Sequence, residues 1–296
     1  MKIFELIIPK LRYNEFIEEI KGYTMRPVSW DRSQTRLIFT PNPEICLKTL
    51  EDEEFLEVLR QADYLTSDGI GLYLGYQIND FFARRITCHP KTPLALWERG
   101  WGWGLLPYYT FNILFRKKYL YSLYGDRICW SDITSELVSF AQSEWIKIAI
   151  VDPYFPDDVA KCEAQKHFSS RLSEIFPNLK FEYQILRDDN REEIFESLNN
   201  SDAEICFATL GMKRQEMFCI DVREKCLNIK LALGVGSSFD YYTWFQRRAP
   251  KLWRDTWFEW LYRTFTSPNK LKRLRRIFQA LIVFPLKVII YKSKNL

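Results

Sequence analysis

The segment EICFATLGMKRQE, residues 204–216, is the clearest sign of the fold class, because an apolar run passes through a glycine into a helical pattern. The run Glu204–Thr209 favours a strand, and Lys213–Lys225 has the spacing of a helix. Further strands are predicted at Lys2–Ile8, Thr35–Thr40, Asp63–Thr66, Ile146–Val151, Lys180–Ile185 and Lys230–Val235. Further helices are predicted at Pro43–Arg60 (with a break near Glu51), Gly69–Ile78, Asp132–Ser143, Pro156–Phe176 and Arg191–Asn199. This alternation predicts an α/β fold, with a mostly parallel, Rossmann-like sheet and flanking helices.

Two segments depart from this alternation. The stretch 81–124 is rich in Trp, Tyr and Phe without a regular period, and we predict an aromatic insertion there. Beyond residue 255 the chain becomes helical and basic. We therefore expect an α/β domain over residues 1–255 and a basic helical C-terminal segment over 256–296. In that segment Pro268 stands where a helix can start, and Pro285 is expected to kink or end it.

Charge is divided unevenly between these parts. The whole chain carries 42 Lys and Arg against 38 Asp and Glu, a net charge of +4. Residues 245–296 contain 13 basic and 2 acidic side chains, so an acidic body precedes a strongly basic end. A composition of 47% hydrophobic and 27% charged residues excludes a disordered or fibrous chain.

Cysteine and histidine usage indicates a reduced compartment and no metal centre. The seven Cys include no CxxC pair, which argues against a disulfide framework and a zinc site. The two His residues, His89 and His167, are too few for a His-rich metal site. The first 20 residues lack the apolar core of a signal peptide, and no apolar run reaches the roughly 20 residues that span a bilayer.

Polar residues follow the predicted strands, at the edge of the sheet where ligands collect. Thr35–Thr40 runs into Asn42, and Asp63–Thr66 runs into Asp68 and a glycine. The local sequence favours Asp68 as a helix cap, and the alternative is a general base that faces a cleft.

Glycines mark the other two strand–helix junctions. Gly211 opens a helix whose amides can receive a diphosphate, although a tight turn alone is the commoner reason for such a glycine. Gly234 and Gly236 permit close approach of a ligand to the backbone. A full GxGxxG fingerprint is missing, so a nicotinamide dinucleotide is not supported. The sequence also has no Walker lysine motif and no DxD motif of the kind that holds a metal–nucleotide.

Taken in order, these junctions resemble the WecG/TagA/CpsF family, the family-26 glycosyltransferases. The matching pieces are TPNPE (40–44), DGIG (68–71), DRICWSD (126–132), GMKRQE (211–216), GVGSSFD (234–240), RRAP (247–250), EWLYR (259–263) and SPNKLKR (267–273). The resemblance implies an inverting, metal-independent transfer, without a cofactor, in cell-surface polysaccharide synthesis. The implied donor is a UDP-linked N-acetylmannosamine-type sugar, and the implied acceptor is a polyprenyl-diphosphate-linked amino sugar.

The resemblance also assigns roles to residues. It makes Asp68 the catalytic base, with Thr40 and Asn42 as the polar pair beside it. Arg127 matches an arginine of the family's Arg-Val-x-Gly-x-Asp piece, and Arg85 is a competitor for that match.

The remaining candidate residues belong to the donor side. Gln215 and Glu216 match a pair near the nucleotide-sugar, and Asp240 matches the Phe-Asp piece. The glycines of the two junctions, Gly211 and Gly236, are added as substrate-binding candidates. The basic residues that match positions closing over the diphosphate are Arg263, Lys270 and Arg273. Lys270 stands where arginine is usual, which keeps the charge but loses the bidentate fork.

Departures from the family pattern leave the substrate open. Trp130 replaces an expected glycine, Asp152-Pro153-Tyr154 replaces a glycine-rich turn, and Thr243-Trp244 replaces small residues. Alternatives are therefore a different UDP-sugar, a hexose or a hexuronic acid, or a non-catalytic membrane-surface or assembly protein on the same fold.

The basic end also suggests a location. Leu271–Lys294 interleaves Lys and Arg with Ile, Leu, Phe and Val, so it can lie in a bilayer interface or pack on its own domain. The aromatic insertion can form a second anchor, cover an oligomer surface or shield the core. The resemblance implies a peripheral protein at the cytoplasmic face of the plasma membrane, and a homo-oligomer is left open. A basic end also permits nucleic-acid binding, which no recognition motif supports.

Overall fold

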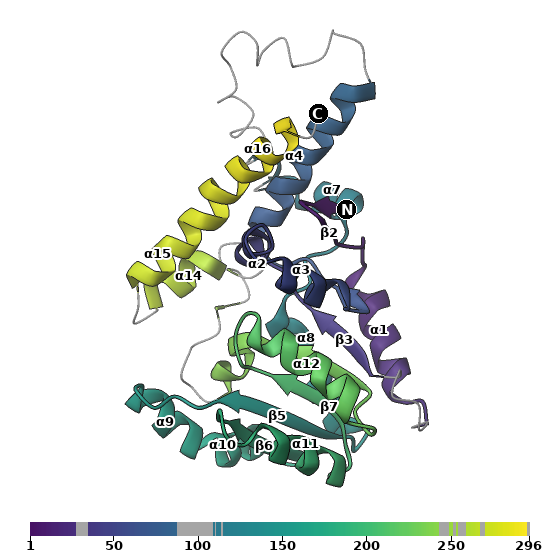
Figure 1. Cartoon of the computed structure of the whole chain (residues 1–296), viewed down its shortest axis with the longest axis vertical. Coiled ribbons are helices and arrows are strands. Elements are labelled where there is room, and N and C mark those ends of the chain that lie inside the picture. Colours follow the sequence, from purple (N-terminus) through teal and green to yellow (C-terminus); the bar gives the residue numbers. More distant parts are fainter. Residues whose placement is uncertain are drawn as a thin grey trace.

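The computed structural model describes the chain in ranges separated by gaps: 1–27, 35–87, 109, 111–113, 115–242, 249–250, 253, 259–266 and 270–294. Six parallel strands form the central sheet, in the order β4-β3-β8-β7-β5-β6 (Figure 1). They are β3 (Arg36–Phe39), β4 (Tyr64–Leu65), β5 (Lys147–Pro153), β6 (Phe181–Leu186), β7 (Ala203–Ala208) and β8 (Leu231–Gly234). Each lies within two residues of a predicted strand, and the α/β fold class is confirmed.

Helices cover both faces of this sheet, so successive strand residues enter different cores. Leu37 and Phe39 of β3 belong to one apolar cluster, and Ile38 belongs to the other. The helices that supply the first cluster are α2 (Pro43–Lys48), α3 (Glu53–Arg60), α4 (Ile70–Thr87), α7 (Lys117–Tyr124), α11 (Arg191–Asn200), α12 (Arg214–Lys225) and α16 (Phe284–Lys294). The second cluster is supplied by α1 (Tyr13–Thr24), α8 (Trp130–Ser143), α10 (Phe168–Ile175) and the 3₁₀ helix η4 (Gly236–Tyr241).

Several helix predictions hold and others are corrected. The expected break near Glu51 separates α2 from α3, where Asp52 caps α3 by accepting the amide of Phe55 at 3.0 Å. The helix predicted over Pro156–Phe176 divides at His167 into α9 (Val159–Lys166) and α10. No element is predicted at α1, although its buried side chains recur at helical spacing, as Phe16, Ile17, Ile20 and Thr24.

The predicted strand Lys2–Ile8 is wrong. Two short antiparallel strands, β1 (Lys2–Ile3) and β2 (Leu6–Ile7), form a separate hairpin. Phe4, at its turn, has a φ of 51°, a left-handed conformation that breaks a continuous strand.

The predicted insertion begins and ends in helices. Helix α4 continues to Thr87, and α7 (Lys117–Tyr124) occupies the other end. Among the aromatic residues expected there as an anchor, Tyr109 is buried in the first apolar cluster. The others lie outside the described residues: Trp97, Trp101, Trp103 and Tyr108.

The C-terminal part contains α14 (Glu259–Thr266), α15 (Lys270–Phe278), the π-helical turn η5 (Gln279–Val283) and α16 (Phe284–Lys294). Of the two outcomes expected at Pro285, a kink or an end, the end does not occur, because α16 continues to Lys294. The wider π turn directly before it replaces the ordinary i−4 pairing, the pairing that a proline cannot complete. Pro268 lies outside the described residues.

Helix α16 packs against α4, and the two run side by side in Figure 1. Phe284 is fully buried in the first apolar cluster, and its ring lies edge-on to Phe4 with centroids 5.8 Å apart. Tyr291 contacts the same Phe4 ring at 5.3 Å, so residues from both ends of the chain share one core.

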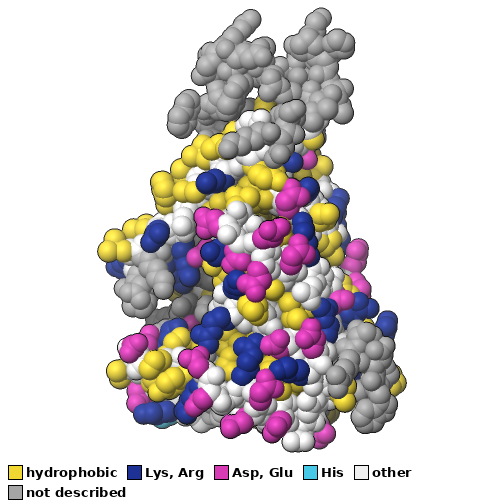
Figure 2. Space-filling model, in the orientation of Figure 1, with side chains coloured by type: hydrophobic (Ala, Val, Ile, Leu, Met, Phe, Trp, Pro, Cys, Tyr) yellow, Lys and Arg dark blue, Asp and Glu magenta, His cyan; other side chains and the backbone are white. Residues whose placement is uncertain are grey.

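The outer side of the C-terminal helices is apolar and basic. Hydrophobic residues exposed there recur at spacings of three or four: Leu271, Leu274, Phe278, Ile282, Leu286 and Ile290. We call these six residues the apolar stripe. Figure 2 shows hydrophobic side chains with Lys and Arg among them over this part of the molecule. In the described ranges, no helix combines the length and the apolar character needed to cross a membrane.

Candidate active site

The turns that follow β3 and β4 meet at the carboxyl edge of the sheet. The hydroxyl of Thr66 lies 3.1 Å from the hydroxyl of Thr40, and both side chains are buried. The amide of Asp68 donates to the carbonyl of Pro41 at 3.1 Å. Parallel strands end at the same edge, so two residues 28 positions apart, Thr40 and Asp68, are brought to one place.

Asn42, the other member of the polar pair, has a structural role in this turn. Its side-chain oxygen accepts the amide of Ile45 at 3.0 Å and caps helix α2. Asn42 therefore fixes the chain directly after Thr40.

The glycines of the DGIG piece have separate reasons. Gly69 has a φ of +90°, which side chains rarely adopt. A Cβ atom on Gly71 would lie 2.6 Å from both the Ala280 carbonyl oxygen and the Pro43 ring. The π turn of the C-terminal segment thus reaches the start of α4, three residues from Asp68.

Arg127 lies in the irregular segment between α7 and α8, beside the Asp68 turn. The amide of Ile128 donates to the carbonyl of Ser67 at 3.0 Å, and the Thr66 hydroxyl lies 3.2 Å from the carbonyl of Ile128. The backbone segment that contains Arg127 therefore lies beside the segment that contains the candidate base, Asp68. The competitor Arg85 lies 15 residues into α4, roughly 22 Å along the helix, and its side chain is not among those described.

Gln215 and Glu216 are buried and bound to each other. The Gln215 amide nitrogen donates to Glu216 Oε1 at 2.8 Å, and the Gln215 oxygen accepts the amide of Gly236 at 3.0 Å. The amide of Lys213 donates to Glu216 Oε2 at 2.7 Å. Burial raises the pKa of Glu216 to about 7. This pair joins the turn after β7 to the turn after β8.

The turn after β7 contains a lysine that the sequence reading overlooked. Gly211 and Lys213 both have positive φ, 83° and 70°. The Lys213 ammonium group lies 2.9 Å from Asp52, the residue that caps α3, and 2.6 Å from Glu54 in the first turn of that helix. The lysine amide is already paired with Glu216, so one of the amides considered for an anion near Gly211 is occupied.

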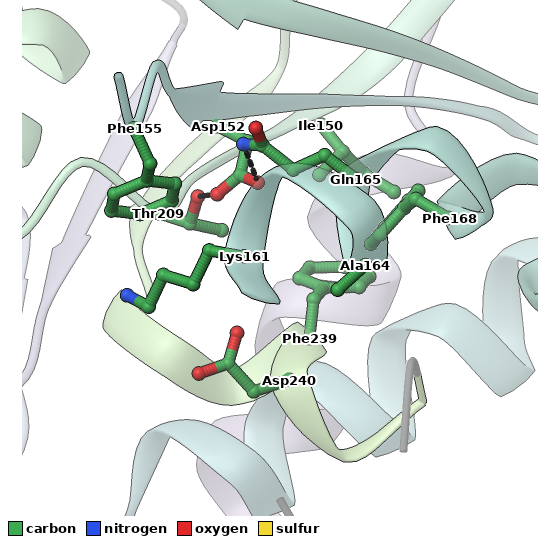
Figure 3. Close-up of a pocket in the computed structure, with 10 residues that line it drawn as sticks. All are labelled: Ile150, Asp152, Phe155, Lys161, Ala164, Gln165, Phe168, Thr209, Phe239 and Asp240. Carbon is green, nitrogen blue, oxygen red and sulfur yellow. Dashed lines mark hydrogen bonds between the residues drawn. The ribbon is translucent and has the colours of Figure 1, made fainter. Parts of the chain in front are cut away.

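A pocket opens at the ends of β5 and β7 (Figure 3). The chain leaves β5 through α9 and α10, toward the second core, and leaves β7 through α12, toward the first. Such a change of direction creates a crevice between neighbouring parallel strands. The lining residues are Ile150, Asp152, Phe155, Lys161, Ala164, Gln165, Phe168, Thr209, Phe239 and Asp240.

Asp152, known from the sequence only as a departure from a glycine-rich turn, is the centre of a hydrogen-bond network. Its Oδ2 atom accepts the Gln165 amide at 2.7 Å and the Tyr183 hydroxyl at 2.9 Å. Its Oδ1 atom accepts the hydroxyl of Thr209. The carboxylate therefore ties together β5, β6, the end of β7 and helix α9.

Asp240 and Lys161 face the same space within this pocket (Figure 3). Burial raises the pKa of Asp240 to about 6, Lys161 opposes that shift, and Asp152 adds to it. The Lys161 ammonium group lies 3.9 Å from the centroid of the Phe155 ring, a cation–π contact.

The basic C-terminal candidates lie on the other side of the site. Lys270 is exposed and Arg273 is half-buried on α15, whereas Arg263 lies in α14 with its side chain outside the described set. A further arginine, Arg276, lies 3.4 Å from Glu44 and joins α15 to the first turn of α2. No sequence signal distinguished Arg276 from its basic neighbours.

In the described part of the chain, no three or more His, Cys, Asp and Glu side chains are grouped so as to hold a metal ion.

One family model matches this chain, and it describes the glycosyl transferase WecG/TagA/CpsF family. The match covers residues 1–90 and 113–296. It leaves out only 91–112, a narrower stretch than the predicted insertion. All the turns described above lie inside the match. The chain therefore belongs to the glycosyl transferase WecG/TagA/CpsF family, whose members are glycosyltransferases.

Proposed function

We propose that this protein moves an N-acetylmannosamine-type sugar from a UDP-sugar to a polyprenyl-diphosphate-linked amino sugar, with inversion and without a metal. The product is an intermediate of cell-surface polysaccharide synthesis. The family supports glycosyl transfer as the reaction class. The observation that carries the assignment of the site is the meeting of Thr40 and Asp68 at the ends of neighbouring strands.

In this mechanism Asp68 is the general base. Its carboxylate takes the proton of the acceptor hydroxyl as that oxygen attacks the anomeric carbon. The bond between this carbon and the diphosphate oxygen breaks from the opposite side, and UDP leaves with the electron pair. Thr40 and the Asn42 cap hold the turn after β3, which lies against the turn that carries Asp68.

The departing diphosphate requires positive charge. Arg127 lies beside the Asp68 turn, and Arg263, Lys270 and Arg273 are assigned to the diphosphate from the C-terminal side. Gln215 and Glu216 act by positioning the backbone of Gly236, because their polar atoms are paired inside the protein. The nucleoside occupies the pocket at β5 and β7.

The acceptor lipid implies a peripheral position at the cytoplasmic face of the membrane. Support comes from the apolar stripe, of which Leu271 is 84% and Phe278 57% exposed. Basic residues on the same helices, such as Arg275 and Lys287, can meet anionic head groups.

Transfer of radiolabelled sugar to a lipid-linked acceptor tests the mechanism. We expect Asp68→Ala to lower turnover by about 10²- to 10⁴-fold, since the base is lost. Wild-type activity should persist in EDTA. Equal turnover by Asp68→Ala would exclude Asp68 as the base, and strict metal dependence would exclude the metal-free scheme. A panel of UDP-linked hexoses and hexuronic acids in the same assay identifies the donor sugar.

Flotation with phosphatidylglycerol-containing vesicles tests the location. The double variant Leu271→Ser, Phe278→Ser should bind markedly less, because it removes two exposed members of the apolar stripe. The control Ile7→Ser, Val159→Ser alters exposed side chains elsewhere, 69% and 76% accessible. An equal loss in both variants, or in neither, would reject the stripe as the anchor.

A further inference from the structure

The described residues between 109 and 124 have two unlike sides. The inner side is buried in the first apolar cluster through Tyr109, Ile113, Leu120 and Tyr124. The outer side carries three exposed aromatic residues, which we call the aromatic face: Phe111, Phe115 and Tyr119. The Phe115 ring is 71% exposed, an unusual position for so large an apolar side chain.

Helical hydrogen bonds and a spacing of four residues place the aromatic face on one side of the backbone. The amide of Arg116 donates to the carbonyl of Asn112 at 2.8 Å, and the amide of Leu120 donates to the carbonyl of Arg116 at 3.0 Å. Side chains four positions apart on such a backbone are neighbours. The rings of Phe111 and Phe115 accordingly contact each other, with centroids 4.8 Å apart.

Polar contacts on the inner side fix this segment on α4. The side chain of Gln77 donates to the carbonyl of Tyr109 at 3.4 Å and accepts the Asn112 amide nitrogen at 3.2 Å, and both contacts are buried. The Tyr124 hydroxyl donates to Asp80 of the same helix at 2.7 Å. Turning the segment over would leave buried polar groups without partners, so the aromatic face is held outward.

Basic side chains accompany the aromatic face. Arg116 and Lys118 are exposed next to it, and residues 99–125 contain no Asp or Glu. Lys10, also exposed, donates to the carbonyl of Ser122 in α7 at 2.6 Å and adds a third positive charge. Aromatic rings favour the interfacial depth of a bilayer, and Lys and Arg are attracted to anionic lipids there.

We propose that the aromatic face binds the surface of an anionic lipid bilayer, as a contact separate from the apolar stripe. This inference rests on the membrane location in the proposed function and adds a second point of attachment. Helices α7 and α16 both pack against α4, in the part of the molecule away from β5 and β6 (Figure 1). Attachment through both helices fixes the orientation of α4, which begins two residues after Asp68.

A second copy of this chain is the other candidate for this face, and the charge pattern argues against it. In a two-fold contact, the same patch of surface meets itself. Arg116 and Lys118 would then lie near the same two residues of the partner, and residues 99–125 offer no carboxylate between them. Lipid phosphates supply the opposite charge that a second copy lacks at this face.

Flotation of the full chain with vesicles of phosphatidylglycerol and phosphatidylcholine tests the proposal. The double variant Phe111→Ser, Phe115→Ser should partition about ten-fold more weakly, because two exposed rings no longer enter the interface. Arg116→Gln, Lys118→Gln keeps the rings and should weaken partition by about five-fold for each charge removed. That second loss should disappear with pure phosphatidylcholine vesicles, which carry no net charge.

The matched control is Trp145→Ser, Val159→Ser, which changes exposed apolar side chains outside the face and should partition like the wild type. Wild-type partition of the aromatic double variant would overturn the proposal. So would the loss of a dimer in size-exclusion chromatography with unchanged flotation, because a second copy would then be the occupant.

The stripe variant Leu271→Ser, Phe278→Ser distinguishes this inference from the proposed function. If that variant loses vesicle binding while the aromatic double variant keeps it, only the second contact fails. If the wild type itself does not float, the proposed membrane location fails with it.

Discussion

The two halves of the sheet's carboxyl edge are supported in different ways. The half at β3 and β4, with Thr40 and Asp68, consists of short turns, and its outer support comes from the C-terminal helices. Ala280 lies against Gly71, and Phe284 lies against Gly75. At the half at β5 and β7, with Asp152 and Asp240, the described residues that line the pocket all lie between Ile150 and Asp240.

Under the proposed function, this difference separates the part of the site that carries the candidate base from the part that would bind the nucleoside. Changes in the C-terminal helices should reach the candidate base through α4, while the pocket keeps its shape. Besides the β3–β8 ladder, Glu216 and Lys213 form a side-chain connection between the halves, because Lys213 pairs with Asp52 before α3 and Glu216 is bound to Gln215 and thereby to Gly236.

Phe284→Ala should have the largest effect on stability. It removes a fully buried ring that packs against Phe4 and Gly75, and such truncations cost about 3–5 kcal/mol. Phe278→Ala, on the same helical segment but 57% exposed, should change the free energy of unfolding by less than about 0.5 kcal/mol. Urea denaturation of both variants measures the difference. Similar losses of unfolding free energy in the two variants would mean that the C-terminal helices do not support the half of the sheet edge at β3 and β4.

Gly71→Ala should have an intermediate effect, directed at the site itself. The added methyl group would lie 2.6 Å from the Ala280 carbonyl oxygen, so α4 and the π turn must separate, at about 1–3 kcal/mol. Gly22→Ala is the matched control, because a Cβ atom added at that position of α1 would meet no described atom beyond its own helix within 4 Å. We expect Gly71→Ala to lower sugar transfer while UDP affinity stays unchanged. A parallel loss of UDP affinity would contradict the independence of the two halves.

The smallest effect concerns pH and the connection between the halves. Folding raises the pKa of Glu216 from 4.5 to about 7, so the folded protein binds a proton that the unfolded chain releases. The contribution of Glu216 to stability is therefore fully present below pH 4.5 and is lost as the pH rises through about 7. Asp240, with a raised pKa, contributes in the same direction. Denaturation midpoints at pH 5.5 and 8 should differ less in Glu216→Gln than in the wild type; an unchanged difference would remove Glu216 from this account.

Much of the fold follows from local sequence, because alternating burial leaves a period in each strand and helix. The six sheet strands and the break between α2 and α3 were predictable for this reason. The meeting of Thr40 with Asp68 also follows, since parallel strands end at one edge. The hairpin at Lys2–Ile7 was not predictable from the apolar pattern, because its two-residue strands are too short to show a period.

The contacts that complete the site were beyond such reasoning. Lys213 and Asp52 are 161 positions apart, and Arg276 and Glu44 are still more distant, so no local pattern links them. Asp152 shows the same limit. Its residue type signalled only that the turn differs from the family pattern, whereas its role depends on donors from three other elements.

The shared core of Phe4, Phe284 and Tyr291 has a consequence for the order in which the protein forms during translation. The hairpin emerges from the ribosome first, yet its packing partners are synthesised about 280 residues later. Until then its apolar side chains remain without those partners. The described lining of the pocket at β5 and β7 ends at Asp240 and can assemble while synthesis continues, whereas the half that carries Asp68 gains its C-terminal support last.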